Sequence, residues 1–154
     1  MSMQRKISGI DLDTMALTVW AEARGESITG QCAVAWVIRN RWEQPGWWSR
    51  QRGDGILDDT IQAVCRDPWQ FSCWNPSDPQ SRKLHDPATL QRDDVQAIYK
   101  ICERVLSEPR DDDPTLGSDH YCTRSIAPHT KWAISRKPTA SIGNHVFYRI
   151  GLHP

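Results

Sequence analysis

The chain of 154 residues lacks several features that would assign it to a class at once. No apolar run approaches the roughly 18 residues that a membrane-spanning helix needs. The N-terminal "MSMQRKISGIDLD" has a basic pair but no apolar stretch after it, so we expect no secretory signal. There is no Lys/Arg cluster large enough to follow a nucleic-acid groove, and 19 basic residues balance 19 acidic ones. We therefore expect neither membrane insertion nor a nucleic-acid partner.

Cysteine is odd in number and lacks any CxxC pair. The five residues are Cys32, Cys65, Cys73, Cys102 and Cys122. This pattern argues against a zinc ribbon and against a full disulfide framework. Free, mostly buried thiols are the simplest interpretation, and one disulfide between Cys65 and Cys73 is the alternative.

Tryptophan, by contrast, is abundant, with eight residues in this short chain. Some should be core residues, but "GWW" and "CWN" stand in polar segments and indicate exposed aromatic rings. Sugars are common partners of such rings, because the apolar faces of a pyranose pack on indole.

The first half of the chain predicts two helices. A buried stripe with helical spacing runs from Asp11 to Arg24, with Asp11 placed to cap the helix and Gly25 just past its last turn. A second helix is expected over residues 29–42 with Ser27 as its N-cap. Its "CAVAWVI" is apolar on every side, which is typical of a helix in the middle of a bundle.

The second half mixes irregular and regular segments. "DTIQAV" predicts a short helix, residues 67–89 a long irregular stretch around "WQFSCWN", and residues 92–107 an amphipathic helix. Near the end, the alternation of Val146, Tyr148 and Ile150 predicts a short strand. The expected fold class is α+β but mainly α, with a small late β element, in a single domain spanning residues 1–154.

Two carboxylates in "VWAEARGES" raise a chemical question. If Gly25 ends the helix, Glu22 lies in the last turn, where the carbonyl dipoles disfavour negative charge, and it follows Trp20. Both features raise a carboxyl pKa, and an acid that stays protonated near neutral pH can protonate a glycosidic oxygen. Glu26 lacks this context and is expected to be a solvated or ion-paired group, with Arg24 as a candidate partner. From this stretch alone, an ordinary surface role for Glu22 is the favoured interpretation, because a Glu near a helix end is usually a surface residue.

Four motifs in order resemble one enzyme family. "WAEARGESITGQCAVAWVIRNR" is similar to the signature of the SleB-type cell-wall hydrolases, and "QFSCW", "DHYCT…APHTKWA" and "TASIGNHVFYR" follow in the family's order. The resemblance covers nearly the whole chain, from about Leu12 to Arg149. It implies a lysozyme-like helical domain that cleaves the MurNAc–GlcNAc β-1,4 bond of peptidoglycan, and Glu22 matches the family's catalytic acid.

The resemblance also implies a mechanism, because many relatives are lytic transglycosylases. In these enzymes one Glu protonates the leaving oxygen, the sugar's own C6 hydroxyl captures the cationic centre, and a 1,6-anhydro product forms. No second carboxylate is required, unlike in most glycosidases. A hydrolytic muramidase with Asp119 or Glu26 as second acid is the closest alternative. A non-catalytic sugar-binding module is another.

Five further residues are candidates for substrate binding. In "WQFSCWN", Gln70 and Ser72 offer hydrogen bonds to sugar groups and Trp74 offers a stacking face, although a packed loop would explain them too. Tyr121 in "DHYCT" is a candidate for positioning the acid, with core packing as its alternative. His145 completes the set of candidates.

A zinc amidase is the last alternative, suggested by His120, His129 and His145 with Cys122 nearby in sequence. Their spacing matches no HExxH helix, so we favour structural histidines and expect no metal and no cofactor. Gly143 is expected to mark a turn into the last strand.

The resemblance implies bacterial glycan strands as the partner. We expect a monomer made in the host cytoplasm that acts on the wall in the periplasm or outside, delivered by a holin if it is phage-derived.

Overall fold

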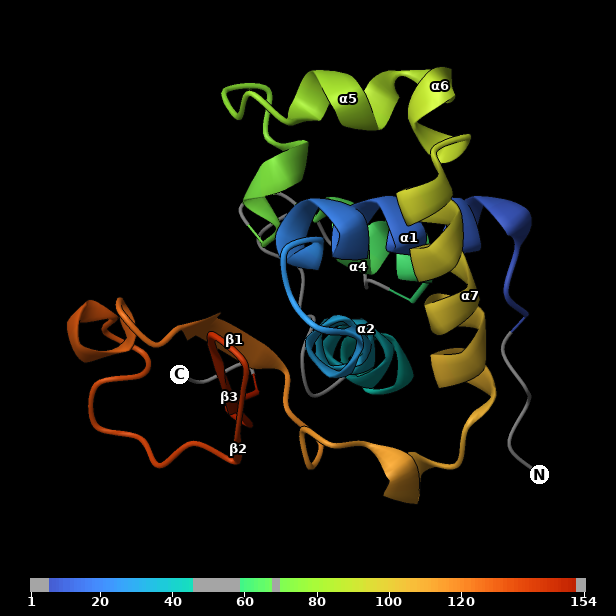
Figure 1. The fold of residues 1–154 in the computed structure, drawn as a ribbon. Coiled ribbons are helices and arrows are strands. Elements are labelled where there is room, and N and C mark those ends of the chain that lie inside the picture. The colour runs from blue at the N-terminus through green and yellow to red at the C-terminus, as the bar shows by residue number, and fades with distance from the viewer. Residues whose placement is uncertain (1–5, 46–58, 68–69, 152–154) are drawn as a thin grey trace.

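The fold was analysed in a computed structural model that describes residues 6–45, 59–67 and 70–151. Helices make up most of the first two thirds, and a three-stranded sheet follows near the end (Figure 1). This confirms the mainly α, α+β class. The segment "GWW" and the basic loop "WWSRQRGDG" lie outside the described residues.

The first helix, α1 (Gly9–Ala23), begins two residues earlier than the sequence predicts. Its N-cap is Ser8, whereas Asp11 was expected to cap it. Asp11 instead occupies the third helical position and completes a capping box, since the Ser8 hydroxyl accepts from the Asp11 amide and the Asp11 carboxylate accepts from the Ser8 amide. The C-cap is Arg24, so Gly25 lies just past the helix as expected.

The second helix, α2 (Ile28–Glu43), runs through the middle of the molecule, where Figure 1 views it nearly end-on. Ser27 is its N-cap and accepts from the Gly30 amide, as predicted. Its interior positions are almost all buried, because α1, α4 (Ile61–Arg66) and α7 (Asp93–Ser107) pack on it from one side and the sheet from the other. The expected short helix and amphipathic helix are α4 and α7.

The stretch that was expected to be irregular contains three short helical segments. They are η1 (Ser72–Trp74), α5 (Ser81–His85) and α6 (Pro87–Leu90). The sequence signal for α6 was available, because Asp86 caps it and Pro87 occupies its first position. Segments of three to five residues are too short to show a helical period, which is why they were missed.

The sheet has the strand order β1–β3–β2, all antiparallel. Its strands are β1 (His120–Thr123), β2 (Ala140–Ile142) and β3 (His145–Tyr148), with the single turns η2 (Arg110–Asp112) before β1 and η3 (Ala127–His129) after it. The predicted strand therefore exists, but it ends before Ile150. All four of its residues are buried, because Phe147 packs on α2 while Val146 and Tyr148 pack under the segment that connects β1 to β2.

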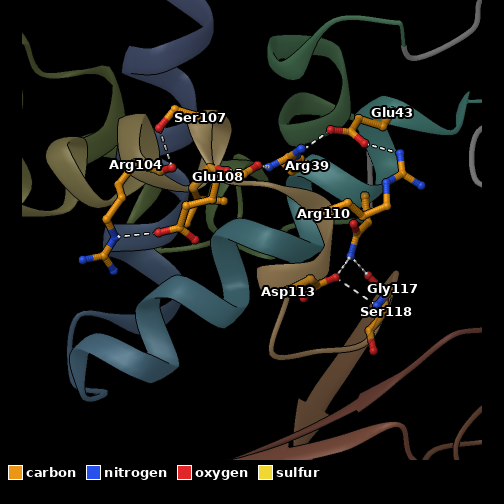
Figure 2. Close-up of polar contacts among 11 residues, drawn as sticks. Arg39, Glu43, Arg104, Ser107, Glu108, Arg110, Asp113, Gly117 and Ser118 are labelled. Carbon is orange, nitrogen blue, oxygen red and sulfur yellow. Dashed lines mark hydrogen bonds and ion pairs between the residues drawn. The ribbon is translucent and has the colours of Figure 1, made fainter.

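A polar network fastens the C-terminal end of α2 to the segment that leads into the sheet (Figure 2). Arg39 donates to the carbonyl oxygens of Val105, at 2.7 Å, and Glu108, at 2.6 Å, which close the end of α7. Arg39 also pairs with Glu43, and Glu43 pairs with Arg110. This end of α2 thus organises the chain between α7 and β1.

All five cysteines are free and buried, as the sequence indicated. The alternative of a Cys65–Cys73 disulfide is therefore not realised in this structure. Burial raises the pKa of the Cys65 thiol to about 12, so it remains protonated.

Among the helices that the structure describes, none has both the length and the hydropathy to cross a bilayer.

Candidate active site

Glu22 lies in the last turn of α1, where the sequence placed it. It is half-buried, between the buried Trp20 and the buried Ala23. The helix ends directly after it, so its carboxyl group points to the region where the helical part of the molecule meets the sheet.

Two groups from distant parts of the chain reach this carboxyl. The Tyr121 hydroxyl, from β1, donates to Glu22 Oε2 at 3.1 Å. The Cys73 thiol, from η1, also hydrogen-bonds to Glu22. The structure therefore brings the candidate acid and the candidate positioning residue together across 99 residues of sequence.

The pKa of Glu22 is raised above its ordinary value of 4.5. Desolvation by burial is the largest cause, and the negative charge of Asp78 adds to it. The hydrogen bonds from Tyr121 and Cys73 and the positive charge of Arg41 act in the opposite direction, because they favour the carboxylate. The site thus favours a protonated acid and also supplies groups that stabilise its conjugate base.

Both donors keep their own protons. Burial and the neighbouring Glu22 raise the pKa of the Tyr121 hydroxyl well above 10. Burial and the same carboxyl raise the pKa of the Cys73 thiol far above its ordinary value of 9.0. Because neither group ionises near neutral pH, both remain hydrogen-bond donors toward Glu22.

Glu26 has different surroundings from those that the sequence suggested. Its carboxylate accepts from the Asn144 amide at 3.2 Å and from Asn144 Nδ2 at 3.3 Å, and it lies 3.3 Å from His145 Nδ1. Arg24 is not its partner, since Arg24 donates to Gln80 and lies over the Trp20 ring. Glu26 therefore holds the turn between β2 and β3 against the junction of α1 and α2.

That turn places His145 beside Tyr121. The two rings meet edge to face, with centroids 4.9 Å apart. Burial lowers the pKa of His145, and Glu26 partly opposes this effect, so the imidazole is neutral near pH 7. Gly143 adopts φ +57°, and a Cβ there would lie 3.3 Å from Glu26 Oε2, which explains the glycine in this predicted turn. His145 therefore contacts Tyr121, which in turn donates to Glu22.

Residues that sequence reasoning missed lie at the end of the first motif, "IRNR". Asn40 donates to Asp113 at 2.8 Å and to the Ser118 carbonyl at 2.9 Å. Arg41, which is 4% exposed, donates to the Asp119 carbonyl at 2.7 Å. Both side chains fix the segment that enters β1, and so they determine where Tyr121 lies. Both residues belong to the first family motif, and this position was the sequence signal that could have identified them.

In the "WQFSCWN" segment, the residue that contacts Glu22 is Cys73. The residues predicted to bind substrate are Gln70, Ser72 and Trp74. Trp74 Nε1 donates to the Thr18 hydroxyl at 2.9 Å, and the Arg66 guanidinium lies over its ring at 4.5 Å. Trp74 is therefore packed against the helices, and one ring face is covered. Ser72 is exposed and Gln70 is half-buried. Sugar contacts by these three residues stay a prediction.

The remaining histidines and acids do not gather into a metal site. No group of three or more His, Cys, Asp or Glu side chains that could hold a metal ion occurs among the described residues. His120 Nδ1 lies 2.9 Å from Asp119. The Asp119 carboxylate is 2% exposed and accepts from the amides of Ile150, at 2.8 Å, and Gly151, at 2.7 Å. These bonds give Asp119 a structural role at the end of the sheet.

Comparison with known proteins agrees with this architecture. Residues 25–148 match the family described as Cell Wall Hydrolase, which is most of the chain. The chain belongs to the cell wall hydrolase family. The resemblance to SleB-type enzymes is thereby confirmed, although the match begins three residues after Glu22, so the role of Glu22 depends on the geometry described above.

The relatives of this cell wall hydrolase include two spore cortex-lytic enzymes. The one from Halalkalibacterium halodurans is 29% identical over 137 residues, which cover 89% of this chain and 34% of the relative. The one from Oceanobacillus iheyensis is 30% identical over 137 residues, covering 89% of this chain and 41% of the relative. The chain thus spans between a third and two fifths of the length of these curated relatives.

Two solved catalytic domains share the fold. The catalytic domain of the germination-specific lytic transglycosylase SleB from Bacillus anthracis superposes with a TM-score of 0.67 at 25% identity, covering 96% of this chain and all of that domain. The catalytic domain of Bacillus cereus SleB gives a TM-score of 0.70 at 24% identity, covering 95% of this chain and 94% of that one. The whole described architecture therefore corresponds to a known catalytic domain.

Proposed function

We propose that this cell wall hydrolase cleaves the β-1,4 bond between MurNAc and GlcNAc in peptidoglycan as a lytic transglycosylase, within a single domain. The observation that carries the proposal is the half-buried Glu22 with raised pKa, held at 3.1 Å by the Tyr121 hydroxyl. The spore cortex-lytic relatives and the SleB fold support the same substrate class.

The reaction needs one carboxyl group in two protonation states. Glu22 gives its proton to the glycosidic oxygen, and the bond from that oxygen to the anomeric carbon of MurNAc breaks. The MurNAc C6 hydroxyl oxygen then bonds to the anomeric carbon, and its proton passes to the Glu22 carboxylate. The donors Tyr121 and Cys73 stabilise the carboxylate between these steps, and the acid is regenerated at the end.

The one-carboxylate mechanism agrees with the surroundings of the other acids. Glu26 is bound to the turn at Asn144, and Asp119 is bound to the end of the sheet. The negative charge of Asp78 adds to the raised pKa of Glu22, so Asp78→Asn is the variant that tests a second carboxylate for a hydrolytic muramidase.

Mass spectrometry of digested peptidoglycan tests the proposal. A transglycosylase gives 1,6-anhydroMurNAc ends, whereas a muramidase gives products heavier by one water. We expect anhydro ends from the parent and from Asp78→Asn, and no digestion by Glu22→Gln. Hydrolytic products that disappear in Asp78→Asn would establish the muramidase instead.

A zinc amidase would release peptides from the glycan and lose activity in EDTA. We expect the activity of this chain to persist in EDTA.

The predicted setting, a monomer delivered by a holin, is a separate part of the proposal. Expression of the chain in a bacterial cytoplasm should leave cells intact, and co-expression with a holin should cause lysis. Lysis without a holin would contradict this delivery route. Sedimentation of the purified chain tests the monomer.

A further inference from the structure

The charges of this neutral chain are unevenly distributed. All 19 acidic residues lie at or before Asp119, so residues 120–154 contain none. The same region carries five basic residues, Arg124, Lys131, Arg136, Lys137 and Arg149. We call the described part of this region, residues 120–151, the basic lobe. It consists of the sheet and the segment between β1 and β2.

The basic lobe contains a pocket of about 390 Å³. It is lined by Lys131, Trp132, Ser135 and Arg136. This volume is near the lower end of the range for small-molecule sites. Two cations and a hydroxyl beside an indole provide hydrogen-bond donors and an apolar surface, which suits a carboxylate attached to a small organic group.

The pocket is held in shape by its surroundings. The Trp132 ring contacts Tyr148 edge to face, with centroids 5.4 Å apart, and lies 5.0 Å from His120. Backbone hydrogen bonds from Ala133 to Thr130 and from Arg136 to Ala133, at 2.9 and 3.1 Å, fold the lining segment into consecutive turns. A binder with a pre-formed shape loses little conformational entropy when its ligand arrives.

The pocket has no carboxylate partner of its own. No ion pair that the described residues form includes Lys131 or Arg136. Lys131 is exposed and Arg136 is half-buried. The positive potential of the lobe is therefore directed to an external anion.

The pocket lies on the other side of β1 from Glu22. Tyr121 projects toward Glu22, and its neighbour His120 contacts Trp132, because successive strand residues point to opposite faces. In Figure 1 the segment that carries the pocket, in orange, lies on the side of the sheet away from α2.

We propose that this pocket binds free carboxylates of the peptide stems attached to MurNAc, so that the basic lobe selects stem-bearing strands. The inference rests on the proposed function, since it places the cleaved strand at Glu22. Under the proposed function, peptidoglycan is the anionic polymer bound at Glu22, and its stems carry carboxylates on short peptides. A lipid surface is the competing anion, but a recessed pocket fits a single carboxylate better than a flat array of headgroups.

Binding to sacculi tests the pocket without requiring turnover. Each variant is made in a Glu22→Gln background, so that the glycan stays intact. Lys131→Glu reverses a charge at the pocket, Lys131→Arg retains it, and Lys100→Glu makes the same reversal on the exposed face of α7 as the matched control. The three variants are compared on untreated sacculi, on sacculi whose carboxylates have been converted to amides, and on vesicles containing phosphatidylglycerol.

On untreated sacculi we expect Lys131→Glu to bind about tenfold more weakly or worse, which is the worth of one charge-assisted hydrogen bond. Lys131→Arg and Lys100→Glu should bind like the parent. On amidated sacculi all chains should bind equally weakly. Parent-like binding by Lys131→Glu, or a loss that persists on amidated sacculi, would overturn the inference. A loss seen on vesicles alone would assign the lobe to lipid.

The two proposals fail in different ways. If the Glu22-containing parent yields no anhydro ends from untreated peptidoglycan, the proposed function is wrong. If it yields these ends and Lys131→Glu binds untreated sacculi like the parent, only the stem-binding pocket is wrong.

Discussion

Glu22 and Glu26 are four residues apart and have opposite surroundings in the structure. Glu22 is desolvated and its pKa is raised, while Glu26 is bound to the turn at Asn144. Burial disfavours the carboxylate at Glu22, whereas the Glu26 carboxylate accepts two hydrogen bonds from Asn144. The different assignments of these two residues therefore have a physical basis that can be measured.

The difference in stability between Glu22→Gln and the parent should depend on pH. The folded pKa of Glu22 lies above its ordinary value of 4.5, so between the two values the folded state binds more protons than the unfolded state, and stability falls as pH rises through this window. Glutamine cannot ionise, so the variant should melt higher than the parent near pH 7, on the order of a few degrees.

Calorimetry at two pH values checks this expectation, because the difference should shrink near pH 4. Equal melting temperatures of parent and variant at both pH values would contradict a raised pKa.

The activity of Glu22→Gln should fall about 100- to 10,000-fold, the usual contribution of a positioned proton donor, whereas Glu26→Gln should lose far less activity.

Tyr121→Phe should move the pH profile. The Tyr121 hydroxyl lowers the pKa of Glu22, so its removal raises that pKa further. Because the protonated acid is the active form, the alkaline limb of kcat should shift to higher pH, while kcat falls roughly tenfold from the loss of one hydrogen bond to the carboxylate. A residue that only packs would lower activity without shifting the limb, so pH–rate profiles separate the two roles.

At the scale of elements, Asp11 joins the starts of two helices. Its carboxylate accepts from the Ser8 amide at 3.0 Å and the Ser8 hydroxyl at 2.9 Å in α1, and from the Gln62 amide at 2.9 Å in α4. The sequence identified Asp11 as a capping residue but could not reveal the bond to α4. That bond depends on how the two helices pack.

Asp11→Ala should destabilise the fold without affecting chemistry. It removes the buried carboxylate that accepts from the backbone amides of Ser8 and Gln62, and the expected loss is about 2–3 kcal/mol. Urea unfolding measures the loss, with Asp13→Ala on the same helix as the control. Activity per folded molecule should stay at the parent level, and a stability equal to that of the control would disprove the shared cap.

At the scale of the whole molecule, the chain joins two parts of different character. The helical part supplies Glu22 and Cys73, and the sheet supplies Tyr121. Buried polar contacts from α2, above all those of Asn40 and Arg41, hold the parts together. The geometry of the site therefore depends on contacts far from the carboxyl itself.

Arg39→Met should weaken the attachment between α2 and α7. It removes hydrogen bonds to the carbonyls of Val105 and Glu108 but keeps an apolar stem against Trp36. Because these bonds are partly buried, we expect a loss on the order of 2–3 kcal/mol. Arg92→Met, which removes an exposed pair with Asp94, should melt close to the parent. Thermal melts of the two variants side by side check the difference, and equal losses would contradict it.

Local patterns in the sequence determined much of this protein. Apolar stripes located α1 and α7, and a run that is apolar on every side located α2. Ser27 located a cap and Gly143 located a turn, because each of these signals acts within a few residues. The ordered motifs identified the family and singled out Glu22 and Tyr121.

Tertiary structure alone decided which groups surround each acid. Cys73 and Asp78 act on Glu22, and Glu26 bonds to Asn144 rather than to its neighbour Arg24, since these contacts join segments that no local period relates. Desolvation and charge–charge interactions depend on distance in space. The sequence could therefore single out Glu22 as the candidate acid, but the pKa and partners of Glu22 were set by packing.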